Sequence, residues 1–410
     1  MSPPIRLTEY IASTPHRLTV AERDALQTVV PSMSITAASG AQDEYILTPG
    51  GTIGLVRVGE LQVEIAPRLP VERVLFLVSY ALDPTRWRDD VVHAMKDTHL
   101  FEAIIPTFAH HVRSCLRRGL LYGYRTIEET HTTVRGRIRL ADQLRARPGL
   151  LLPVELQRDD FTADILENRL LLAATERLWR LPLRHESSRK TLRDLRSQFA
   201  NVSPTVYPSL RVPEPVWTRL NGRYRPAITL ARLILGGGGV ALDSGDVAAT
   251  GVLLDMPRVF EDFVVRALRE ALDVSASTFP QGGQLRGKLT LDVEGLVRLK
   301  PDLSWWVDGA CVFAGDCKYK RIKVDGVPNN ADLYQLLAYT TAFDLEEGLL
   351  IYAAGERRPG ARTVRHAGKR LHVHTLHLAG TPDAVLDEVA LVAREIRRMA
   401  RRAHHRTAVA

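Results

Sequence analysis

The chain has 410 residues, more than one hydrophobic core usually organises, so we expect two or three domains. Its 45% hydrophobic and 25% charged residues are ordinary for a folded protein and exclude a disordered chain. Lysine and arginine (55) outnumber aspartate and glutamate (47), which gives a net charge of +8. A basic balance favours polyanionic partners such as nucleic acid, although arginine-rich chains are often basic without binding DNA.

The cysteines and the distribution of apolar residues exclude two further classes. The three cysteines form neither a CxxC pair nor a cluster with metal-ligand spacing. This usage is typical of a reducing compartment and predicts neither disulfides nor a zinc site. The first residues lack the basic start and apolar run of a signal peptide, and no stretch approaches the ~20 apolar residues of a membrane span. We therefore expect a cytoplasmic protein without a membrane partner.

Residues 1–95 have a β-rich pattern and are predicted to form an N-terminal region of their own. Alternating apolar residues over 54–58 and 61–65 predict a β-hairpin. A helix is predicted over 71–82, and it ends before the proline at position 84, because a proline disfavours helical backbone at the residue before it.

Residues 96–245 are predicted to be mainly helical. Apolar residues at helical spacing indicate helices over 101–122 and 164–181, with a strand-and-turn element over 133–138 between them. Four consecutive glycines at 236–239 resist any regular element and predict a flexible joint before the last region.

Residues 246–410 alternate between helical and strand patterns, which predicts an α/β unit and makes the whole chain a multidomain α+β protein. The predicted elements are a helix over 257–272, strands over 288–293, 297–307 and 310–319, a helix over 331–343, strands over 348–353 and 371–378, and a helix that begins at 382. The last helix ends in a basic segment with no acid after Glu395. Its arginines either contact phosphates or form a solvated helix end, and the sequence leaves both alternatives open.

One segment of the last region brings acids and an amine together. Two apolar strands flank Asp308-Gly309, a strong turn signal, and predict a hairpin. Asp302 begins the first strand, and antiparallel pairing brings it opposite Asp316 near the end of the second. Strand alternation places Asp316 and Lys318 on one face, with Cys317 on the other.

This arrangement is suited to phosphodiester hydrolysis. Two close carboxylates repel each other, and a hard divalent cation relieves the repulsion. Mg²⁺ takes oxygen ligands and keeps several waters, so Asp302, Asp316 and a phosphate oxygen suffice to hold it. The metal lowers the pKa of a bound water, while Lys318 orients the nucleophile and stabilises charge that develops on the phosphate. Short patterns of this kind also arise by chance, and acids beside strands are often solvated turn residues.

Pro301-Asp302 followed by Asp316-Cys317-Lys318 resembles the PD-(D/E)XK nuclease motif. The resemblance implies a small mixed sheet with helices on both sides, Mg²⁺ as the cofactor and DNA as the substrate. It also implies two supporting residues. A glutamate on the preceding helix often joins the metal shell in such sites, and Glu261 is the candidate, with its neighbour Asp262 as the rival. Gln335, on the helix after the strands, matches an accessory position.

Further segments are similar to McrC proteins in consistent order along the chain. They are residues 65–68, 120–124 with 135–137, 166–171 and 255–263. The resemblance therefore covers nearly the whole chain and is more specific than the catalytic motif alone. McrC proteins are nuclease subunits of modified-cytosine-dependent restriction complexes. Their partner McrB is an AAA+ GTPase, whose hydrolysis McrC stimulates through its non-nuclease half. The family often has a β-branched or other small residue where this chain has Cys317.

The resemblance implies an Mg²⁺-dependent endonuclease that cuts double-stranded DNA carrying modified bases such as 5-methylcytosine, together with a McrB-like AAA+ GTPase. The implied metal ligands are Asp302, Asp316 and Glu261, and Lys318 and Gln335 complete the catalytic set. Two alternatives remain open: a non-catalytic activator or scaffold of an AAA+ NTPase with a decayed nuclease fold, and a DNA repair or transposition nuclease of the same fold.

Two other patterns are interpreted as structural. Residues 282–289 nearly match a phosphate-binding P-loop, but Leu289 stands where that motif needs Ser or Thr. A strand-like alternation follows where a P-loop needs a helix, so we expect no nucleotide site there. Trp305 and Trp306 have the chemistry to stack on bases, but adjacent strand residues face opposite sides, and we favour core packing.

Overall fold

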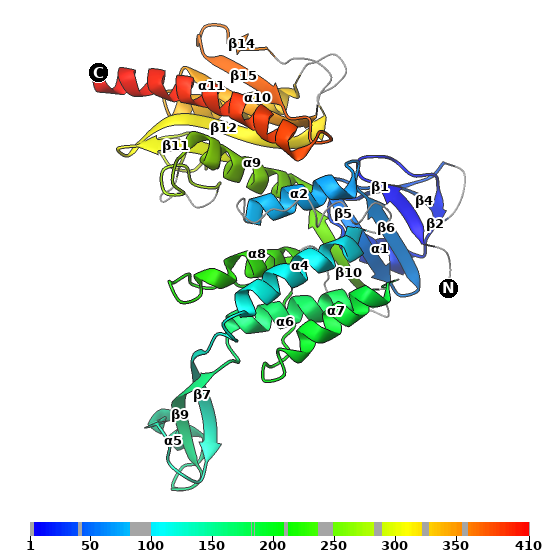
Figure 1. Cartoon of the computed structure of the whole chain (residues 1–410), viewed down its shortest axis with the longest axis vertical. Helices are drawn as coiled ribbons and strands as arrows, with labels where there is room; N and C mark the ends of the chain where they lie inside the picture. Colours follow the sequence, from blue (N-terminus) through cyan, green and yellow to red (C-terminus); the bar gives the residue numbers. More distant parts are fainter. Residues whose placement is uncertain are drawn as a thin grey trace. The chain divides into compact units, whose positions relative to one another are not determined.

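The structure is a computed structural model that describes residues 4–39, 43–82, 100–181, 183, 185–208, 212–236, 249–282, 289–321, 328–354 and 360–409. The chain divides into two compact units, one made of Met1–Ala103 with Leu242–Ala410 and the other of Ile104–Ala241. Both combine helices with β-sheet (Figure 1), which confirms the mixed α+β character. The three regions read from the sequence stay a prediction. Among the described helices, none combines the length and apolarity needed to cross a membrane.

The first unit begins with two small sheets. The elements are β1 (Ile5–Thr8), β2 (His16–Arg17), α1 (Val20–Val29), β3 (Ser34–Ala37), β4 (Glu44–Thr48), β5 (Thr52–Val58), β6 (Leu61–Ala66) and α2 (Val71–Leu82). One sheet has the order β2-β4-β3, and the other β1-β6-β5-β10. The predicted hairpin is confirmed, because Val58 pairs with Leu61 across the β5–β6 turn. The helix predicted over 71–82 is confirmed as α2.

The sheet of β1 is completed by a strand from far along the chain. β10 (Ala249–Asp255) pairs antiparallel with β5 and leads directly into α9 (Met256–Leu272), which confirms the helix predicted over 257–272. Leu253 of β10 is buried in the same core as Leu26 of α1. The N-terminal strands and the start of α9 therefore belong to one folded body.

The rest of the first unit is a five-stranded mixed sheet with the order β11-β12-β13-β15-β14. Its elements are β11 (Leu303–Val307), β12 (Ala310–Arg321), α10 (Asn330–Ala342), β13 (Glu347–Ala354), β14 (Arg362–Thr363), β15 (Arg370–Thr375) and α11 (Pro382–Val409). All of these elements were predicted except the short β14, and β11 is shorter than the strand predicted for it. The antiparallel β11–β12 hairpin turns at Asp308-Gly309 as expected.

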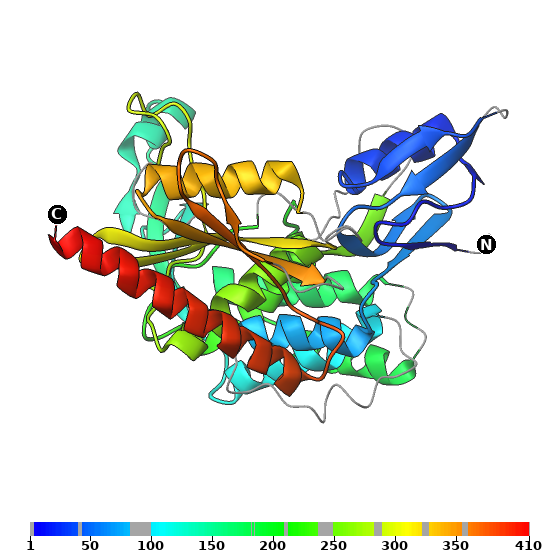
Figure 2. The same cartoon turned by 90° about the horizontal axis from the view of Figure 1, so that it is seen from above.

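The two helices after the hairpin cover opposite faces of this sheet (Figure 2). Leu371 and Val373 of β15 pack with Leu336 of α10. The alternate residue His372 contacts Glu395 of α11 instead. The apolar residues at helical spacing along α11 are buried, at Val385, Val389, Val392, Ile396 and Met399. Strand alternation thus divides the side chains between an α10 face and an α11 face.

Two predicted strands of this unit are corrected by the structure. Lys288 lies outside the described residues. Residues 289–293 form one isolated bridge, from Thr290 to Arg298, with flanking backbone hydrogen bonds to 297 and 299, and no regular strand. The carboxylate of Asp292 accepts hydrogen bonds from the backbone N–H groups of Leu296 (2.9 Å) and Val297 (2.7 Å). This side chain closes a turn where alternation indicated a strand. The strand predicted over 297–307 is therefore limited to β11.

The second unit contains most of α4 (Leu100–Leu116) together with α6 (Leu166–Trp179), α7 (Glu186–Ser197) and α8 (Arg225–Gly236). Its mainly helical character and the helix predicted over 164–181 agree with the sequence. The helix predicted over 101–122 is too long. It ends at Leu116, because Gly119 adopts the left-handed conformation (φ 79°) that commonly terminates helices. Of the glycines at 236–239, the last three lie outside the described residues.

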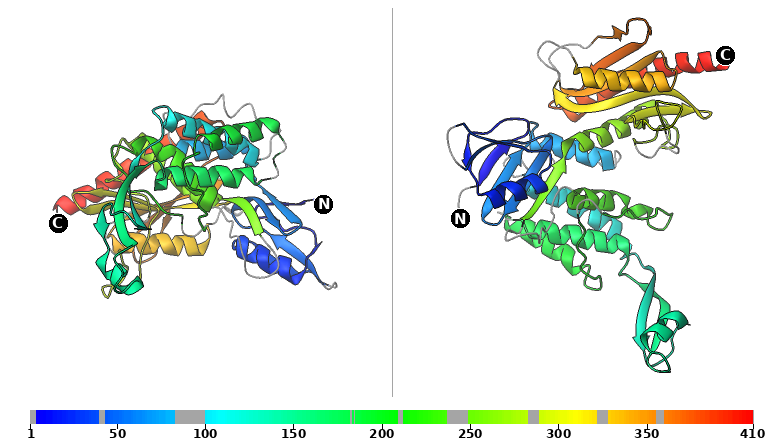
Figure 3. Two further views of the ribbon diagram at one scale, coloured as in Figure 1. Left: turned by 90° about the horizontal axis from the view of Figure 1, so that it is seen from below. Right: turned by 180° about the vertical axis from the view of Figure 1, so that it is seen from behind.

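A β-hairpin in this unit was not predicted. β7 (Gly123–His131) pairs with β9 (Val154–Thr162) over nine residue pairs, and β8 (Arg137–Ile138) joins β9. The strand-and-turn element predicted over 133–138 is strand only in β8. With the short helix α5 (Leu140–Ala146), these strands form a module that extends from the helices of the same unit (Figure 3).

Candidate active site

A β-bulge aligns the two aspartates of the predicted site. Near the turn, Val307 pairs with Ala310 and Trp306 with Cys311, but the register shifts between Trp306 and Trp305. Beyond the shift, Leu303 pairs with Gly315, which brings the preceding Asp302 alongside Asp316. An unshifted hairpin would offset the pair by one residue and turn one side chain to the other face.

The two aspartates are linked through the backbone. The N–H of Asp302 points at Oδ1 of Asp316 (3.4 Å), and the N–H of Cys317 donates to Oδ2 of Asp302 (3.0 Å). Asp316 is almost fully buried, with 1% of its side chain exposed. The carboxylates are therefore held by the β11–β12 hairpin itself.

Lys318 lies between an acid and an amide. Its ammonium group forms an ion pair with Asp316 and donates to Oε1 of Gln335 on α10 (2.8 Å). Gln335 Nε2 donates to the hydroxyl of Tyr339 (2.7 Å), and that hydroxyl donates to the carbonyl of Lys300 (3.0 Å). The chain of contacts fixes the side-chain rotamer of Lys318 from the α10 side.

Glu261 of α9 adjoins the same group. The position that a Cβ on Gly282 would occupy is 3.2 Å from Oε1 of Glu261 and 3.1 Å from Cα of Asp302, so glycine permits their close approach. The rival Asp262 instead accepts a hydrogen bond from Gln281. All five residues singled out in the sequence, Asp302, Asp316, Lys318, Glu261 and Gln335, thus lie in one neighbourhood.

The electrostatics of this neighbourhood are those of crowded acids. Burial, and then the nearby Asp302, raises the pKa of Asp316 to about 7 against the opposing effect of Lys318. Burial, then Asp302 and Asp262, raises the pKa of Glu261 to about 8. Burial disfavours the charge of Lys318, but the nearby acids, Asp316 foremost, together raise the pKa of the lysine. Acids with raised pKa values beside a cation are typical of functional sites.

The residues present fit a hard divalent cation. Among the described residues, no three or more His, Cys, Asp and Glu side chains are grouped as a complete metal cage. Mg²⁺ does not need one, since it is commonly held by one or two carboxylates, waters and substrate phosphates. Asp302 and Asp316 offer adjacent carboxylate oxygens whose mutual repulsion such an ion would relieve.

A second lysine contact was missed in the sequence. Lys320 Nζ lies 2.8 Å from Oδ2 of Asp332, and the hydroxyl of Tyr352 donates to the same oxygen (2.5 Å). Lys318 and Lys320 share a strand face, while Asp332 and Gln335 are one helical turn apart on α10, so the two pairs form neighbouring rungs. The i, i+2 and i, i+3 spacings were the available signal.

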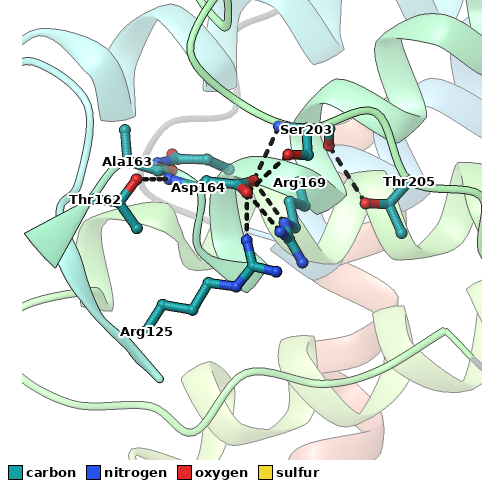
Figure 4. A network of polar contacts seen from close by, with 8 residues as sticks. Arg125, Thr162, Ala163, Asp164, Arg169, Ser203 and Thr205 are labelled. Atoms are coloured by element: carbon teal, nitrogen blue, oxygen red, sulfur yellow. Dashed lines mark hydrogen bonds and ion pairs between the residues drawn. The ribbon is translucent and has the colours of Figure 1, made fainter. Parts of the chain in front are cut away.

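The second unit has a polar network of its own (Figure 4). Asp164 accepts hydrogen bonds from Arg125 (2.5 Å), Arg169 (2.5 Å) and the hydroxyl of Ser203 (2.8 Å). Hydrogen bonds from Arg169 and Ser203 lower the pKa of Asp164, against the effect of burial. Beside it, the buried Asn168 donates to the carbonyl of Ala163 (2.7 Å). These contacts anchor the first turn of α6.

The remaining sequence features have structural partners. Trp306 packs edge-on against Phe343 and donates to Ser304, and both Trp305 and Trp306 are half-buried. In the basic end of α11, Arg402 pairs with Glu347 (3.5 Å) and Arg406 with Glu346 (2.6 Å).

The chain is similar to known proteins over most of its length. The family described as McrBC 5-methylcytosine restriction system component matches residues 47–353. A solved structure described as the refined half-complex from the tetradecameric assembly of Thermococcus gammatolerans McrB AAA+ hexamers with bound McrC contains a chain that is 17% identical. The similarity covers 96% of this chain and 100% of that chain, with a TM-score of 0.56.

A second solved structure, the cryo-EM structure of the Thermococcus gammatolerans McrBC complex, contains a chain that is 20% identical. There the similarity covers 66% of this chain and 88% of that chain, with a TM-score of 0.40. No curated protein sequence matches. At these identities, the first of the two structures supports a shared fold.

Proposed function

Because the chain belongs to the McrBC 5-methylcytosine restriction system component family, we propose that it is the DNA-cutting subunit of a modification-dependent restriction system. The main observation that supports this proposal is that Asp302, Asp316 and Lys318 lie together on the α10 face of the sheet, beside Glu261. We assign residues 246–410 to a PD-(D/E)XK nuclease domain. We propose that its substrate is double-stranded DNA with modified cytosine and that the protein is located in the cytoplasm.

The proposed reaction is hydrolysis of a phosphodiester bond. Asp302 and Asp316 would hold Mg²⁺, with Glu261 as the third candidate ligand, and the bound ion would lower the pKa of a water and neutralise phosphate charge. Lys318 acts on the reacting groups directly: its ammonium group donates hydrogen bonds to the attacking oxygen or to the phosphate oxygens as negative charge develops. Gln335 holds that ammonium group in place.

The partner in this proposal is a McrB-like AAA+ GTPase, whose hydrolysis the chain stimulates. The similar structure from Thermococcus gammatolerans contains McrB AAA+ hexamers with bound McrC. The hairpin module of the second unit supports a docking role, because its helix α5 and the loop after it expose a run of leucines. These are Leu140, Leu144, Leu150, Leu151 and Leu152. Exposed apolar groups of this density are typical of protein interfaces. We assign partner binding to residues 1–95 and 96–245.

The test is cleavage of methylated plasmid by the purified chain with Mg²⁺, with and without the AAA+ partner and GTP. We expect efficient cutting only in the complete mixture, and none with the Asp316→Ala/Lys318→Ala variant. The matched control is Asp387→Ala/Arg394→Ala, which removes an exposed acid and an exposed basic residue of α11 and should leave cutting intact.

Two outcomes would change the assignment. Equal cutting by the Asp316→Ala/Lys318→Ala variant would remove these residues from catalysis. Stimulation of GTP hydrolysis by a wild-type chain that neither binds Mg²⁺ nor cuts DNA would make it a non-catalytic activator. Isothermal titration with Mg²⁺ and a phosphate-release assay distinguish these cases.

A further inference from the structure

The end of β1 forms a tight corner at Glu9-Tyr10. Glu9 is completely buried, and its backbone N–H donates to the carbonyl of Ala66. Tyr10 has φ 59°, a left-handed conformation that is unfavourable for a bulky side chain. It is stabilised by a hydrogen bond to the carbonyl of Pro49 (2.9 Å) and by the guanidinium of Arg68 over its ring (4.7 Å). A strained residue persists only where its surroundings require it.

Both residues of this corner form hydrogen bonds with Tyr319 of β12, and we call this pair of hydrogen bonds the grip. The hydroxyl of Tyr10 donates to the backbone carbonyl of Tyr319 (3.0 Å), and the hydroxyl of Tyr319 donates to Oε1 of Glu9 (2.9 Å). Gly51 leaves room for the contact, because a Cβ there would lie 2.4 Å from the Tyr10 hydroxyl. Tyr319 is therefore held at its main chain and at its side chain, by residues more than 300 positions earlier.

The grip lies next to the part of β12 where strand pairing becomes irregular. Pairing with β13 runs from Gly315 to Lys318, which pairs with Tyr352, and the register then shifts before Arg321 pairs with Ala354. On the other side, the ladder with β11 ends with Gly315. Lys318 is thus the last regularly paired residue, and the residue after it depends on the corner of β1.

We infer that Glu9 and Tyr10 are positioning residues for Lys318. They fix the backbone of β12 one residue beyond Lys318, on the face opposite Asp316. Gln335 fixes the lysine side chain on the α10 face. The N-terminal sheet, which the proposed function assigns to partner binding, thereby acts directly on the strand that carries the catalytic amine. This step rests on the proposed function, and the contacts themselves are independent of it.

The experiment compares Tyr10→Phe and Tyr319→Phe with Tyr224→Phe in the full chain. Each of the first two removes one hydroxyl of the grip. Tyr224 is the matched control, because it is buried in the second unit and its hydroxyl accepts a hydrogen bond from the N–H of Leu121 (2.9 Å). One readout is the rate of reductive methylation of Lys318, measured by mass spectrometry relative to exposed Lys190. The other is kcat and KM for cutting methylated plasmid in the complete mixture.

We expect Lys318 to be methylated about fivefold faster in both grip variants, the factor that corresponds to one lost hydrogen bond. We expect kcat to fall by a similar factor with KM for DNA unchanged, and Tyr224→Phe to match wild type in both readouts. Unchanged methylation of Lys318 in both variants would overturn the inference, as would faster methylation with unchanged kcat. If the wild-type chain does not cut, the proposed function fails, and methylation of Lys318 alone decides for or against the grip.

Discussion

The two faces of the five-stranded sheet shift the pKa values of their carboxylates in opposite directions. On the α10 face, burial and neighbouring acids raise the pKa of Asp316 to about 7. On the α11 face, hydrogen bonds with His372 and His374 lower the pKa of Glu395. Glu395 lies 3.0 Å from Nδ1 of His372 and 3.2 Å from Arg398.

The contrast separates stabilising acids from reactive ones. A carboxylate that is paired with donors contributes to folding, and Glu395 pairs with His372, His374 and Arg398. On the α10 face, Asp302 and Asp316 lie close together beside Lys318, an arrangement that opposes folding until a cation binds. We therefore expect mutations on the α10 face to reduce activity and mutations on the α11 face to reduce stability.

The largest effect is expected for Asp316→Asn. Loss of a carboxylate oxygen from the proposed metal site should reduce cutting of methylated DNA by at least about 100-fold. The thermal midpoint in EDTA at pH 8 should stay the same or rise, because the variant removes a desolvated charge that Asp302 repels. Calorimetry beside the plasmid assay checks both. A lowered midpoint with unchanged cutting would assign Asp316 to the stabilising class and remove the contrast.

The isosteric counterpart, Glu395→Gln, should give the reverse result. Replacing an ionised acceptor of two histidines should lower the free energy of unfolding by about 1–3 kcal/mol and leave kcat close to wild type. Because the folded-state pKa lies below the ordinary value of 4.5, the stability that Glu395 contributes is present above that pH and is lost on acidification. Urea unfolding at pH 7 and pH 3 measures this, and the variant should differ from wild type less at pH 3.

The pH dependence of the metal-free chain should sharpen the comparison. Glu261 has a pKa of about 8 when folded against an ordinary 4.5, so between these values the folded state binds more protons than the unfolded state. Stability must then fall as pH rises from about 5 to 8. In EDTA, Glu261→Gln should show a flatter decline in its thermal midpoint than wild type, and excess Mg²⁺ should stabilise wild type more at pH 8 than at pH 6. Parallel curves for the two proteins would contradict the raised pKa.

Much of the sheet and its helices could be predicted because local patterns decide them. α9, α10 and α11 have apolar residues at helical spacing, and the Asp308-Gly309 turn indicates the hairpin. The failures have equally local causes. Asp292 closes a turn inside an alternating segment, and Gly119 ends a helix whose apolar pattern continues beyond it.

The composition of the candidate site was predictable, whereas the bulge that aligns it and the long-range contacts that support it were not. The bulge between Trp305 and Trp306 sets the register of Asp302 against Asp316, and no residue pattern predicts this bulge. The grip of Glu9 on Tyr319 joins residues 310 positions apart, a contact that tertiary packing alone creates. Sequence patterns identify the acids and the amine, and long-range packing determines how they meet.

The smallest effect is expected for a substitution of Arg406, which tests whether the end of α11 has only a structural role. Arg406 pairs with Glu346 at 2.6 Å, but both side chains are more than half exposed, so Arg406→Ala should change the free energy of unfolding by less than about 1 kcal/mol. If the arginine only makes this ion pair, the salt dependence of DNA binding should be unchanged. A phosphate contact would instead reduce the slope of log K against log salt by about 1. Fluorescence anisotropy across a salt series separates the two, and a reduced slope would make the end of α11 part of the DNA-binding surface.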